Sequence, residues 1–375
     1  MTSSYPDRPD QRRPPAPPPP TVTPALTPRS ARPLGQAVEE VRARTARPTP
    51  DGWFAVASSA EVRPGRVVTR RLAGQDVVLY RTASGRLRAV RPFCPHLGAH
   101  LGHGGRVHGE NLVCPFHHFE FDPEGTCVAT GYGTPPPRAR LGTLEHREIA
   151  GLVFVWRHGR GEGPSWEIKA PPMEGFRPPH CTVRTVVAHP QDFMENVVDT
   201  GHFTYVHKIV AETVDGPHFD GPRIEALYRL GRTTDGTSGL LASSVTMRMM
   251  MQGLGVFHSE VRIPRWGLEL RGLFCAVPLD QTHMDYRLAV TVRFPHLRHR
   301  GAADALARSL AGPMAWLNAF DTRRDEAIWA NSAYLKHPRL APGDGPILKF
   351  RRWARQFYTE NPAQPTTSPT EGHDG

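Results

Sequence analysis

The chain has 375 residues, of which 39% are hydrophobic and 22% are charged, and its formal net charge is +10. This composition is typical of a globular protein with room for two domains and flanking tails. No stretch approaches the roughly 20 apolar residues of a membrane-spanning helix, and the start of the chain lacks the apolar core of a secretory signal. We therefore expect a cytoplasmic protein without a membrane span.

Much of the excess positive charge lies in residues 1–50, and no basic helix is interleaved with aromatic residues, which argues against nucleic-acid binding.

The two ends of the chain are predicted to be disordered tails. Residues 1–50 are rich in proline, including the run Pro17–Pro20, and they contain almost no aromatic side chains. Such a segment buries too little apolar surface to offset its ordering entropy. The last segment, residues 361–375, is polar and is predicted to be disordered as well.

Residues 51–160 are predicted to form a small antiparallel β domain, because short alternating apolar runs are separated there by turn residues. The expected strands are Val67–Leu72, Val77–Arg81, Leu87–Val90, Leu112–Phe116 and Leu152–Trp156.

Residues 161–360 are predicted to form a second domain, which begins with a proline-rich crossing segment. Helices are expected over residues 191–207 and from residue 302 to about 335. A long antiparallel sheet backed by a C-terminal helix is an α+β arrangement. The expected strands are Val183–Ala188, Ile224–Leu230, Leu240–Met251, Val256–Ile263, Leu268–Val277 and Tyr286–Phe294.

Two short motifs in the first domain combine cysteine with histidine. A Cys-x-His motif begins at Cys94, and a Cys-x-x-His motif begins at Cys114. A Rieske [2Fe–2S] centre needs two thiolates on one iron and two imidazoles on the other. Because each motif offers one of each, we expect Cys94, His96, Cys114 and His117 to bind such a cluster.

A structural zinc site is the alternative reading of these four residues. Zinc sites usually pair like ligands, two Cys and then two His, whereas each motif here mixes the two types. Four nearby histidines fall outside the motif spacing and are expected in loops or at the surface: His100, His103, His108 and His118. The remaining cysteines are isolated and are expected to be small buried residues: Cys127, Cys181 and Cys275.

A second group of candidate ligands lies between Asn196 and His207. Non-haem iron oxygenases hold Fe(II) on one face through two His and one carboxylate. His202 and His207 are five residues apart, so an ideal helix would separate them by about 140°, and a break near His207 would let both face one metal. Asn196, Asp199 and His202 follow a three-residue spacing along one helical face. Asp199 is thereby expected to orient His202 and to pass charge toward a neighbouring cluster.

The third iron ligand must come from another segment. The predicted C-terminal helix offers Asp321, Asp325 and Glu326. Asp325 shares a face with Ile328 and Trp329, which are expected to pack inward, so it is favoured over Asp321. The alternative is that these acids only pair with neighbouring arginines on a solvated face.

Together these residues resemble the Rieske oxygenases that act on steroids and related polycyclic substrates. The segments that carry the resemblance are Gly52–Ala57, Cys94–Gly105, Cys114–His117, Asn196–His207, Asp325–Trp329 and Arg351–Tyr358. The last two are similar to the C-terminal signature of 3-ketosteroid 9α-hydroxylase oxygenases and cholesterol 7-desaturases.

The resemblance implies a Rieske domain joined to a helix-grip catalytic domain, with Asp325 as the iron carboxylate. It also implies a head-to-tail homotrimer, in which the cluster of one subunit feeds the iron of the next through Asp199. NAD(P)H would supply the electrons indirectly, through a ferredoxin or flavin reductase.

The expected function is that of a terminal oxygenase, which uses O2 to hydroxylate or desaturate a large apolar, steroid-like substrate. A Rieske oxygenase that tailors a natural product by amine oxidation, demethylation or oxidative cyclisation is the alternative within this class. From other classes, a pure electron carrier is disfavoured because a second metal motif follows the cluster motif. A binding module without metal is the remaining alternative, and a colourless purified protein with intact cysteines would favour it.

Overall fold

The computed structural model describes residues 47–232 and 245–359. The predicted N-terminal tail lies outside these ranges except for residues 47–50, and the predicted C-terminal tail, residues 361–375, lies outside them entirely. All described residues belong to one compact unit, residues 40–375.

The first half of this unit contains three small antiparallel sheets. Their orders are β1-β10-β9, β2-β3-β4 and β5-β6-β7-β8. The strands are β1 (Gly52–Ser58), β2 (Val67–Leu72), β3 (Gln75–Arg81), β4 (Leu87–Val90), β5 (Arg106–His108), β6 (Asn111–Val113), β7 (Glu120–Phe121), β8 (Cys127–Ala129), β9 (His146–Ile149) and β10 (Leu152–Arg157). The β1 residues are buried throughout, because this strand lies between the first and second halves of the unit.

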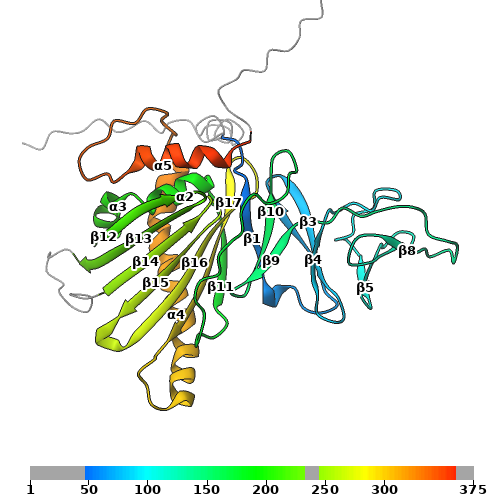
Figure 1. The fold of residues 1–375 in the computed structure, drawn as a ribbon, viewed down its shortest axis with the longest axis horizontal. Coiled ribbons are helices and arrows are strands. Elements are labelled where there is room, and N and C mark those ends of the chain that lie inside the picture. Colours follow the sequence, from blue (N-terminus) through cyan, green and yellow to red (C-terminus); the bar gives the residue numbers. More distant parts are fainter. Residues whose placement is uncertain (1–46, 233–244, 360–375) are drawn as a thin grey trace, which may run out of the picture. The chain divides into compact units, whose positions relative to one another are not determined.

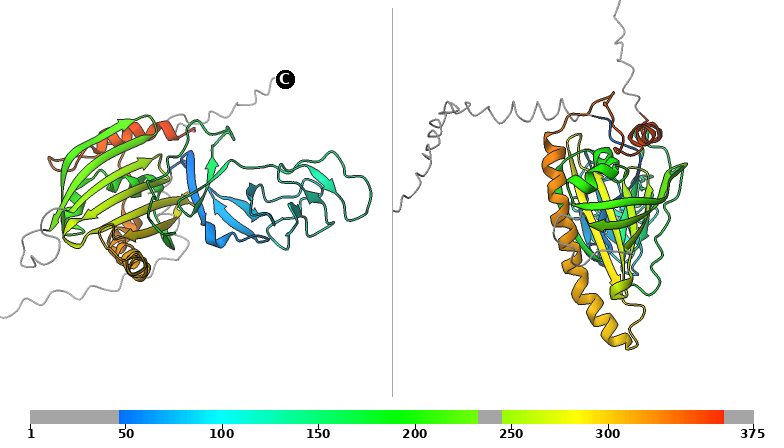
Figure 2. Two further views of the ribbon diagram at one scale, coloured as in Figure 1. Left: turned by 60° about the horizontal axis from the view of Figure 1, so that its bottom comes forward. Right: turned by 90° about the vertical axis from the view of Figure 1, so that its left-hand side faces the viewer.

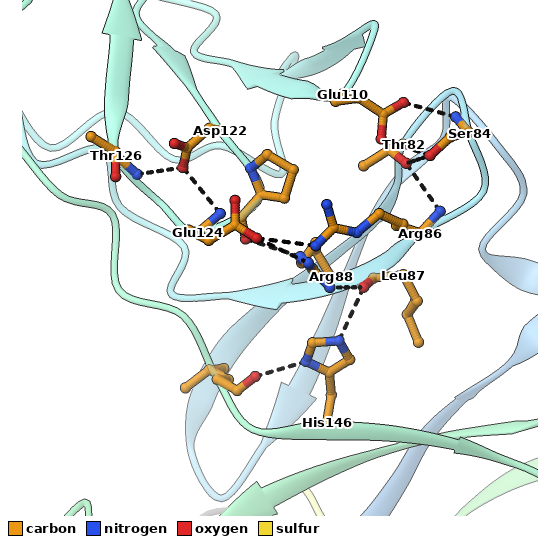
Figure 3. A network of polar contacts seen from close by, with 12 residues as sticks. Thr82, Ser84, Arg86, Leu87, Arg88, Glu110, Asp122, Glu124, Thr126 and His146 are labelled. Atoms are coloured by element: carbon orange, nitrogen blue, oxygen red, sulfur yellow. Dashed lines mark hydrogen bonds and ion pairs between the residues drawn. The ribbon is translucent and has the colours of Figure 1, made fainter.

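A polar network connects the β2-β3-β4 sheet to the turn between β7 and β8 (Figure 3). Asp122 Oδ1 accepts hydrogen bonds from the backbone N–H groups of Glu124 and Thr126 and so closes the turn. Glu124 then accepts from Arg86 at 3.0 Å and from Arg88 at 3.4 Å. These bonds hold the β5-β6-β7-β8 sheet, which carries one of the two Cys/His motifs, on the rest of the domain.

The second half is built on one antiparallel sheet with the strand order β11-β17-β16-β15-β14-β13-β12. The strands are β11 (His180–Val187), β12 (Ile209–Asp220), β13 (Arg223–Arg232), β14 (Val245–Gln252), β15 (Val256–Ile263), β16 (Leu268–Pro278) and β17 (His283–Arg293). The helices are α2 (Pro190–Asn196) and α3 (Thr200–Tyr205), which link β11 to β12, and α4 (Arg300–Asn331) and α5 (Ile347–Ala354), which follow β17. Single 3-10 turns occupy Ser59–Glu61, Pro264–Trp266 and Arg355–Phe357.

One face of this sheet is apolar and is covered by helices. On β17 the residues Met284, Tyr286, Leu288, Val290 and Val292 alternate onto this face and are buried in the main core. Helix α4 packs along β11 and β17, as Figures 1 and 2 show, and α2 packs on β16 and α5. The α+β arrangement with a long C-terminal helix on an antiparallel sheet is confirmed.

The crossing segment covers the opposite face of the sheet. The backbone N–H of Lys169 donates to Gln252 Oε1 at 2.7 Å. The guanidinium groups of Arg271 and Arg293 lie 4.7 and 4.5 Å from the centre of the Phe176 ring. The segment therefore packs on the buried Arg271 and on the partly exposed Arg293.

The predicted strands are largely confirmed, but β1, β5, β7, β8 and β9 were not predicted, and three further details were wrong. Strand β12 was missed, because it is a mostly exposed edge strand with two register shifts and an internal Gly216-Pro217. The strand predicted over Leu112–Phe116 ends at Val113, and Phe116 is 60% exposed in the loop that follows. The single helix predicted over residues 191–207 is two helices. Strand β14 begins at Val245, and residues 240–244 of the predicted strand lie outside the described residues.

No helix within residues 47–232 and 245–359 is both long and apolar enough to cross a membrane.

A buried arginine joins the two halves of the unit. Arg287 on β17 is 4% exposed, and its guanidinium lies 3.1 Å from Glu61 Oε2, in the 3-10 turn after β1. Glu61 also pairs with Arg70, and despite its partial burial these two arginines and the Ser58 backbone hold its pKa below the ordinary value.

Replacing Glu61 by glutamine should lower the free energy of unfolding by about 2 kcal/mol, because Arg287 would stay buried without its carboxylate. A fully buried pair would lose about 3–5 kcal/mol, and the partial exposure of Glu61 reduces this. Urea unfolding followed by far-UV circular dichroism measures the change. Glu212→Gln, which breaks an exposed pair with Arg229, is the matched control, with an expected loss below about 1 kcal/mol. Equal losses in both variants would contradict the role of Arg287.

Candidate metal centres

The four Cys and His residues of the first domain lie in two neighbouring loops. Cys94 and Cys114 are buried, and their side chains are close enough to interact. The imidazole rings of His96 and His117 are half-buried, and their centres are 4.9 Å apart. Phe119 stacks on His96 at 4.2 Å and fixes the plane of that ring. The structure therefore brings the two thiols together and the two imidazoles together.

The local chemistry of these loops fits a [2Fe–2S] cluster. His117 Nδ1 is buried and has no hydrogen-bond partner among the described residues, so it is available as a ligand. Burial, with a smaller contribution from the Cys114 thiol, raises the pKa of Cys94 to about 11. Backbone N–H groups of His96 and Leu97 point to the Cys94 sulfur, as donors often do around cluster thiolates.

The same loops fit a single zinc ion less well. Four tetrahedral ligand atoms around one zinc lie about 3.3–3.8 Å apart, given the usual zinc–ligand bond lengths. Among the described residues, only one group of Cys, His or acidic residues has three ligand atoms mutually within 4.8 Å, and it is not this one.

That one group is His202, His207 and Asp325. His202 lies on α3, His207 follows the end of α3, and Asp325 lies on α4 and is buried. The rings of the two histidines are 5.0 Å apart and nearly perpendicular. Two imidazoles and one carboxylate on one side of a point form the donor set that non-haem iron prefers.

Local backbone geometry explains how histidines five residues apart can meet. Helix α3 ends at Tyr205, and Lys208 adopts a left-handed conformation with φ of 59°. Non-glycine residues seldom adopt this conformation, and it turns the chain directly after His207. The break expected near His207 is thus present.

The expectation that Asn196, Asp199 and His202 share one helical face was wrong, because the chain leaves the helix between α2 and α3. Asn196 is the last residue of α2, and Asp199 is the N-cap of α3. Asp199 Oδ1 accepts from the backbone N–H of His202 at 3.2 Å, which satisfies a donor of the first turn. A side chain at Gly345 would lie 2.2 Å from the Val198 carbonyl oxygen, so the loop before α5 packs tightly on this link.

The ring nitrogens of both histidines have defined neighbours. His202 Nδ1 lies 2.6 Å from the carbonyl oxygen of Asp199, so we assign the proton of this ring to Nδ1. His207 Nδ1 lies 2.9 Å from Asp321 Oδ2, and its Nε2 lies 3.2 Å from Asp325 Oδ2. Each histidine is thereby left with Nε2 directed to the point that the three residues share.

Burial and nearby charges shift the pKa values of the two histidines in opposite directions. Burial lowers the pKa of His202. For His207 burial also opposes the charged form, but the carboxylates of Asp321 and Asp325 outweigh it and raise its pKa to about 9. A metal ion would therefore displace a proton from His207 on binding.

The structure also places the other acids that were considered as ligands. Asp321 contacts the far side of His207, and Glu326 pairs with Arg184 of β11 at 2.7 Å. The face assumed for Asp325 was partly wrong, since Trp329 is buried but Ile328 is 48% exposed. Sequence reasoning did not find the contact between Asp321 and His207, although the four-residue spacing of Asp321 and Asp325 places both on one helical face.

Helix α2, which leads to this site, begins at a histidine that must stay neutral. His189 is the N-cap and is buried, its Nδ1 accepts from the backbone N–H of Gln191, and its Nε2 donates to the carbonyl oxygen of Pro48. Burial, reinforced by the positive charge of Arg47, holds the pKa of His189 well below its ordinary value. Burial likewise lowers the pKa of His258, in strand β15, to about 4.

Acidification below pH 6.5 should therefore destabilise the protein. The unfolded chain takes up protons on both histidines near pH 6.5 while the folded protein does not, so stability falls as pH falls. The slope is up to about 1.4 kcal/mol per pH unit for each histidine. His189→Asn retains a capping side chain and removes one group that takes up a proton on unfolding. The unfolding free energy of this variant should therefore fall less steeply than that of the wild type between pH 6.5 and 5. Parallel slopes for the two proteins would refute this account of His189.

Each half of the molecule matches a known protein family. Residues 52–140 match the Rieske [2Fe–2S] domain, and residues 155–358, more than half of the chain, match the 3-ketosteroid 9α-hydroxylase C-terminal domain. The chain belongs to the Rieske oxygenases that carry this C-terminal domain. This Rieske oxygenase is an oxidoreductase that uses a [2Fe–2S] cluster, a mononuclear iron and electrons supplied by a reductase.

Among its relatives are enzymes of two named activities. A cholesterol 7-desaturase of Ciona intestinalis is 29% identical over 354 residues, with 86% of this chain and 72% of the relative covered. The oxygenase component of a 3-ketosteroid-9-alpha-monooxygenase of Rhodococcus rhodochrous is 24% identical over 322 residues, with 82% of this chain and 84% of the relative covered.

Solved structures of similar proteins support the fold. Apo dicamba monooxygenase has a TM-score of 0.60 at 19% identity and covers 82% of this chain and 97% of its own. The terminal oxygenase of carbazole 1,9a-dioxygenase from Novosphingobium sp. KA1 has a TM-score of 0.59 at 21% identity and covers 86% of this chain and 98% of its own.

Side chains and backbone groups of this Rieske oxygenase orient the candidate metal ligands and shield them from water. When bound, the cluster supplies electrons one at a time and the mononuclear iron activates O2. The carbonyl oxygen of Asp199 fixes the tautomer of His202, and the burial of Asp325 beside Trp329 limits access of water to the carboxylate. Held by His202, His207 and Asp325 alone, an iron would keep positions free for O2 and substrate.

Proposed function

We propose that this protein is the terminal oxygenase component of a Rieske system that hydroxylates or desaturates a large apolar, steroid-like substrate. The observation that carries the proposal is the match of residues 155–358 to the 3-ketosteroid 9α-hydroxylase C-terminal domain. Relatives named for cholesterol and for 3-ketosteroids, each matching more than four fifths of the chain, support it.

In this proposal the two metal groups have separate ligands. The cluster is held by two thiolates and two imidazoles, from Cys94, His96, Cys114 and His117. The mononuclear iron is held by His202, His207 and Asp325, whose ligand atoms lie within 4.8 Å of one another. Asp199 connects the iron site to the cluster that feeds it, and Asn196 supports the link between α2 and α3.

We further propose that the active form is a head-to-tail trimer. Helix α3, with the iron site, and the sheet that contains β5 and β8, with the cluster loop, lie at opposite ends of the unit in Figure 1. An electron would therefore reach an iron more directly from the cluster of a neighbouring subunit. The cluster loops expose Leu97, Phe116 and Tyr132, which are 66%, 60% and 58% exposed, and a neighbouring subunit would bury such residues.

The electron donor in this proposal is a separate ferredoxin or flavin reductase that draws on NAD(P)H. The oxygenase component of the Rhodococcus relative is named as one part of a larger system, which supports a separate donor. The cytoplasmic location expected from the sequence stays a prediction.

Complementation between variant subunits tests the trimer. Differently tagged Cys114→Ala and Asp325→Ala chains would be co-expressed, and mixed oligomers isolated through both tags. Each variant alone should be inactive, since one lacks a complete cluster site and the other the iron carboxylate. A mixed ring has one junction in three at which an intact cluster faces an intact iron site, so about one third of wild-type turnover is expected. Inactive mixed oligomers with full metal content at the intact sites would refute transfer between subunits.

A turnover assay tests the substrate class. Anaerobically purified protein, a surrogate reductase, NADH and O2 would be offered cholesterol and a 3-ketosteroid, with products analysed by mass spectrometry. Gain of one oxygen identifies a monooxygenase, and loss of two hydrogens identifies a desaturase. If both compounds return unchanged while the cluster is reduced, the steroid assignment fails and a tailoring oxygenase becomes the better hypothesis.

A further inference from the structure

Each ring nitrogen of His207 contacts a carboxylate, and both carboxylates belong to helix α4. Asp325 Oδ2 lies 3.2 Å from Nε2, and Asp321 Oδ2 lies 2.9 Å from Nδ1. Asp321 and Asp325 are one helical turn apart on α4, so a single rigid helix sets both contacts. The His207 side chain is 8% exposed, which leaves its Nδ1 dependent on a protein acceptor.

Asp321 is the acceptor within reach of that nitrogen. Nδ1 of His207 is buried and has no well-aligned hydrogen bond among the described residues. The Asp321 carboxylate is close enough, but it lies away from the direction of the N–H bond. A buried N–H group costs about 1–3 kcal/mol when it lacks a partner. A small rotation of the ring or of the carboxylate would satisfy it.

A second contact holds this part of α4 against the end of α3. Arg324 Nη1 donates to the carbonyl oxygen of Val206 at 2.9 Å, and it lies 3.6 Å from Asp321 Oδ1. Arg324 thus fixes the backbone on one side of His207 and the carboxylate that faces its ring. Arg324 lies near Oδ1 of Asp321, at 3.6 Å, whereas Oδ2 lies closer to His207, at 2.9 Å. The two oxygens of Asp321 therefore face different partners.

We propose that Asp321 is a positioning residue for the mononuclear metal: its carboxylate accepts the Nδ1–H of His207, sets the tautomer and plane of the ring, and directs Nε2 to the metal. This inference rests on the proposed ligand set of His202, His207 and Asp325. Asp321 is not a ligand itself, because it contacts the ring nitrogen that faces away from Asp325. Second carboxylates of this kind typically change metal affinity by about 10–100-fold.

Metal titration tests this role without turnover. The mononuclear metal is removed from the full-length protein with a chelator while the cluster absorbance is retained. Anaerobic Co(II) binding is then followed through its ligand-field bands, as the difference from the cluster spectrum. Asp321→Ala should bind Co(II) about 10–100-fold more weakly than the wild type, with shifted bands because His207 is a weaker and less ordered donor. Asp321→Asn retains an acceptor oxygen and should recover part of the affinity.

Two controls separate the possible outcomes. Asp304→Asn removes an exposed acid near the start of the same helix, where it pairs with Arg177, and should leave Co(II) affinity unchanged. Asp325→Ala should abolish binding at this site, and normal binding there would refute the proposed ligand set. If Asp325→Ala loses Co(II) while Asp321→Ala keeps wild-type affinity and bands, the positioning role of Asp321 is overturned and the ligand set stands. Thermal unfolding of each variant identifies any that fails to fold.

Discussion

Replacing Asp325 by alanine should remove the mononuclear iron and leave the [2Fe–2S] cluster in place. The variant loses the one buried carboxylate that meets the two histidines, so its iron content should fall from about three to about two atoms per chain. Turnover should fall at least about a thousandfold, which corresponds to about 4 kcal/mol of transition-state stabilisation. The cluster absorbance should be unchanged, because the four Cys and His residues proposed as its ligands lie in the first half of the unit.

Metal analysis, visible absorbance and product formation measure the three quantities on one sample. Asp304→Ala is the matched control on α4, since Asp304 is an exposed acid away from the histidines. Wild-type iron content together with wild-type turnover in Asp325→Ala would show that another residue supplies the carboxylate.

Replacing Asp199 should leave both metal groups bound and slow turnover by at least about a hundredfold, or about 2.7 kcal/mol of barrier. Asp199 lies between α2 and α3, shortly before the two histidines proposed as iron ligands, and its carbonyl oxygen contacts His202 Nδ1. If electrons cross to the iron near this residue, removing its carboxylate affects transfer more than metal binding.

The choice of substitution matters, because Asp199 also caps α3 through its side chain. Alanine removes this cap and would cost about 1 kcal/mol of helix stability. Asparagine caps a helix equally well and removes only the charge, so Asp199→Asn separates the two roles. Re-oxidation of the reduced cluster after mixing with substrate and O2 measures transfer in a single turnover. Wild-type re-oxidation rates in both variants would remove Asp199 from the path.

The sequence predicted the parts of this fold that have strong local signals. The Cys/His motifs at Cys94 and Cys114 combine residue type with spacing, and the core strands alternate apolar and polar side chains over eight or more residues. The α+β class and the two histidines of the candidate iron site follow from such patterns, whereas Asp325 was favoured on a helical face that was only partly right.

The remaining features depend on tertiary contacts. Strand β12 has no alternating pattern, because as an exposed edge strand it buries few side chains. The break between α2 and α3 is stabilised by the Asp199 cap and by the close approach of Gly345, which is distant in sequence. The contact of Asp321 with His207 likewise joins two segments more than a hundred residues apart.

The contacts of residues 47 and 48 limit how far the N-terminus can be shortened. Arg47 pairs with Asp192, and the carbonyl oxygen of Pro48 receives the only donor of the neutral His189 ring. A shortened protein that begins at Asp51 would expose the start of α2 and leave that N–H group unpaired, one helix before the proposed iron ligands. Trimming the proline-rich segment for crystallisation should therefore stop before Arg47, because the last residues of this segment pack on the start of α2.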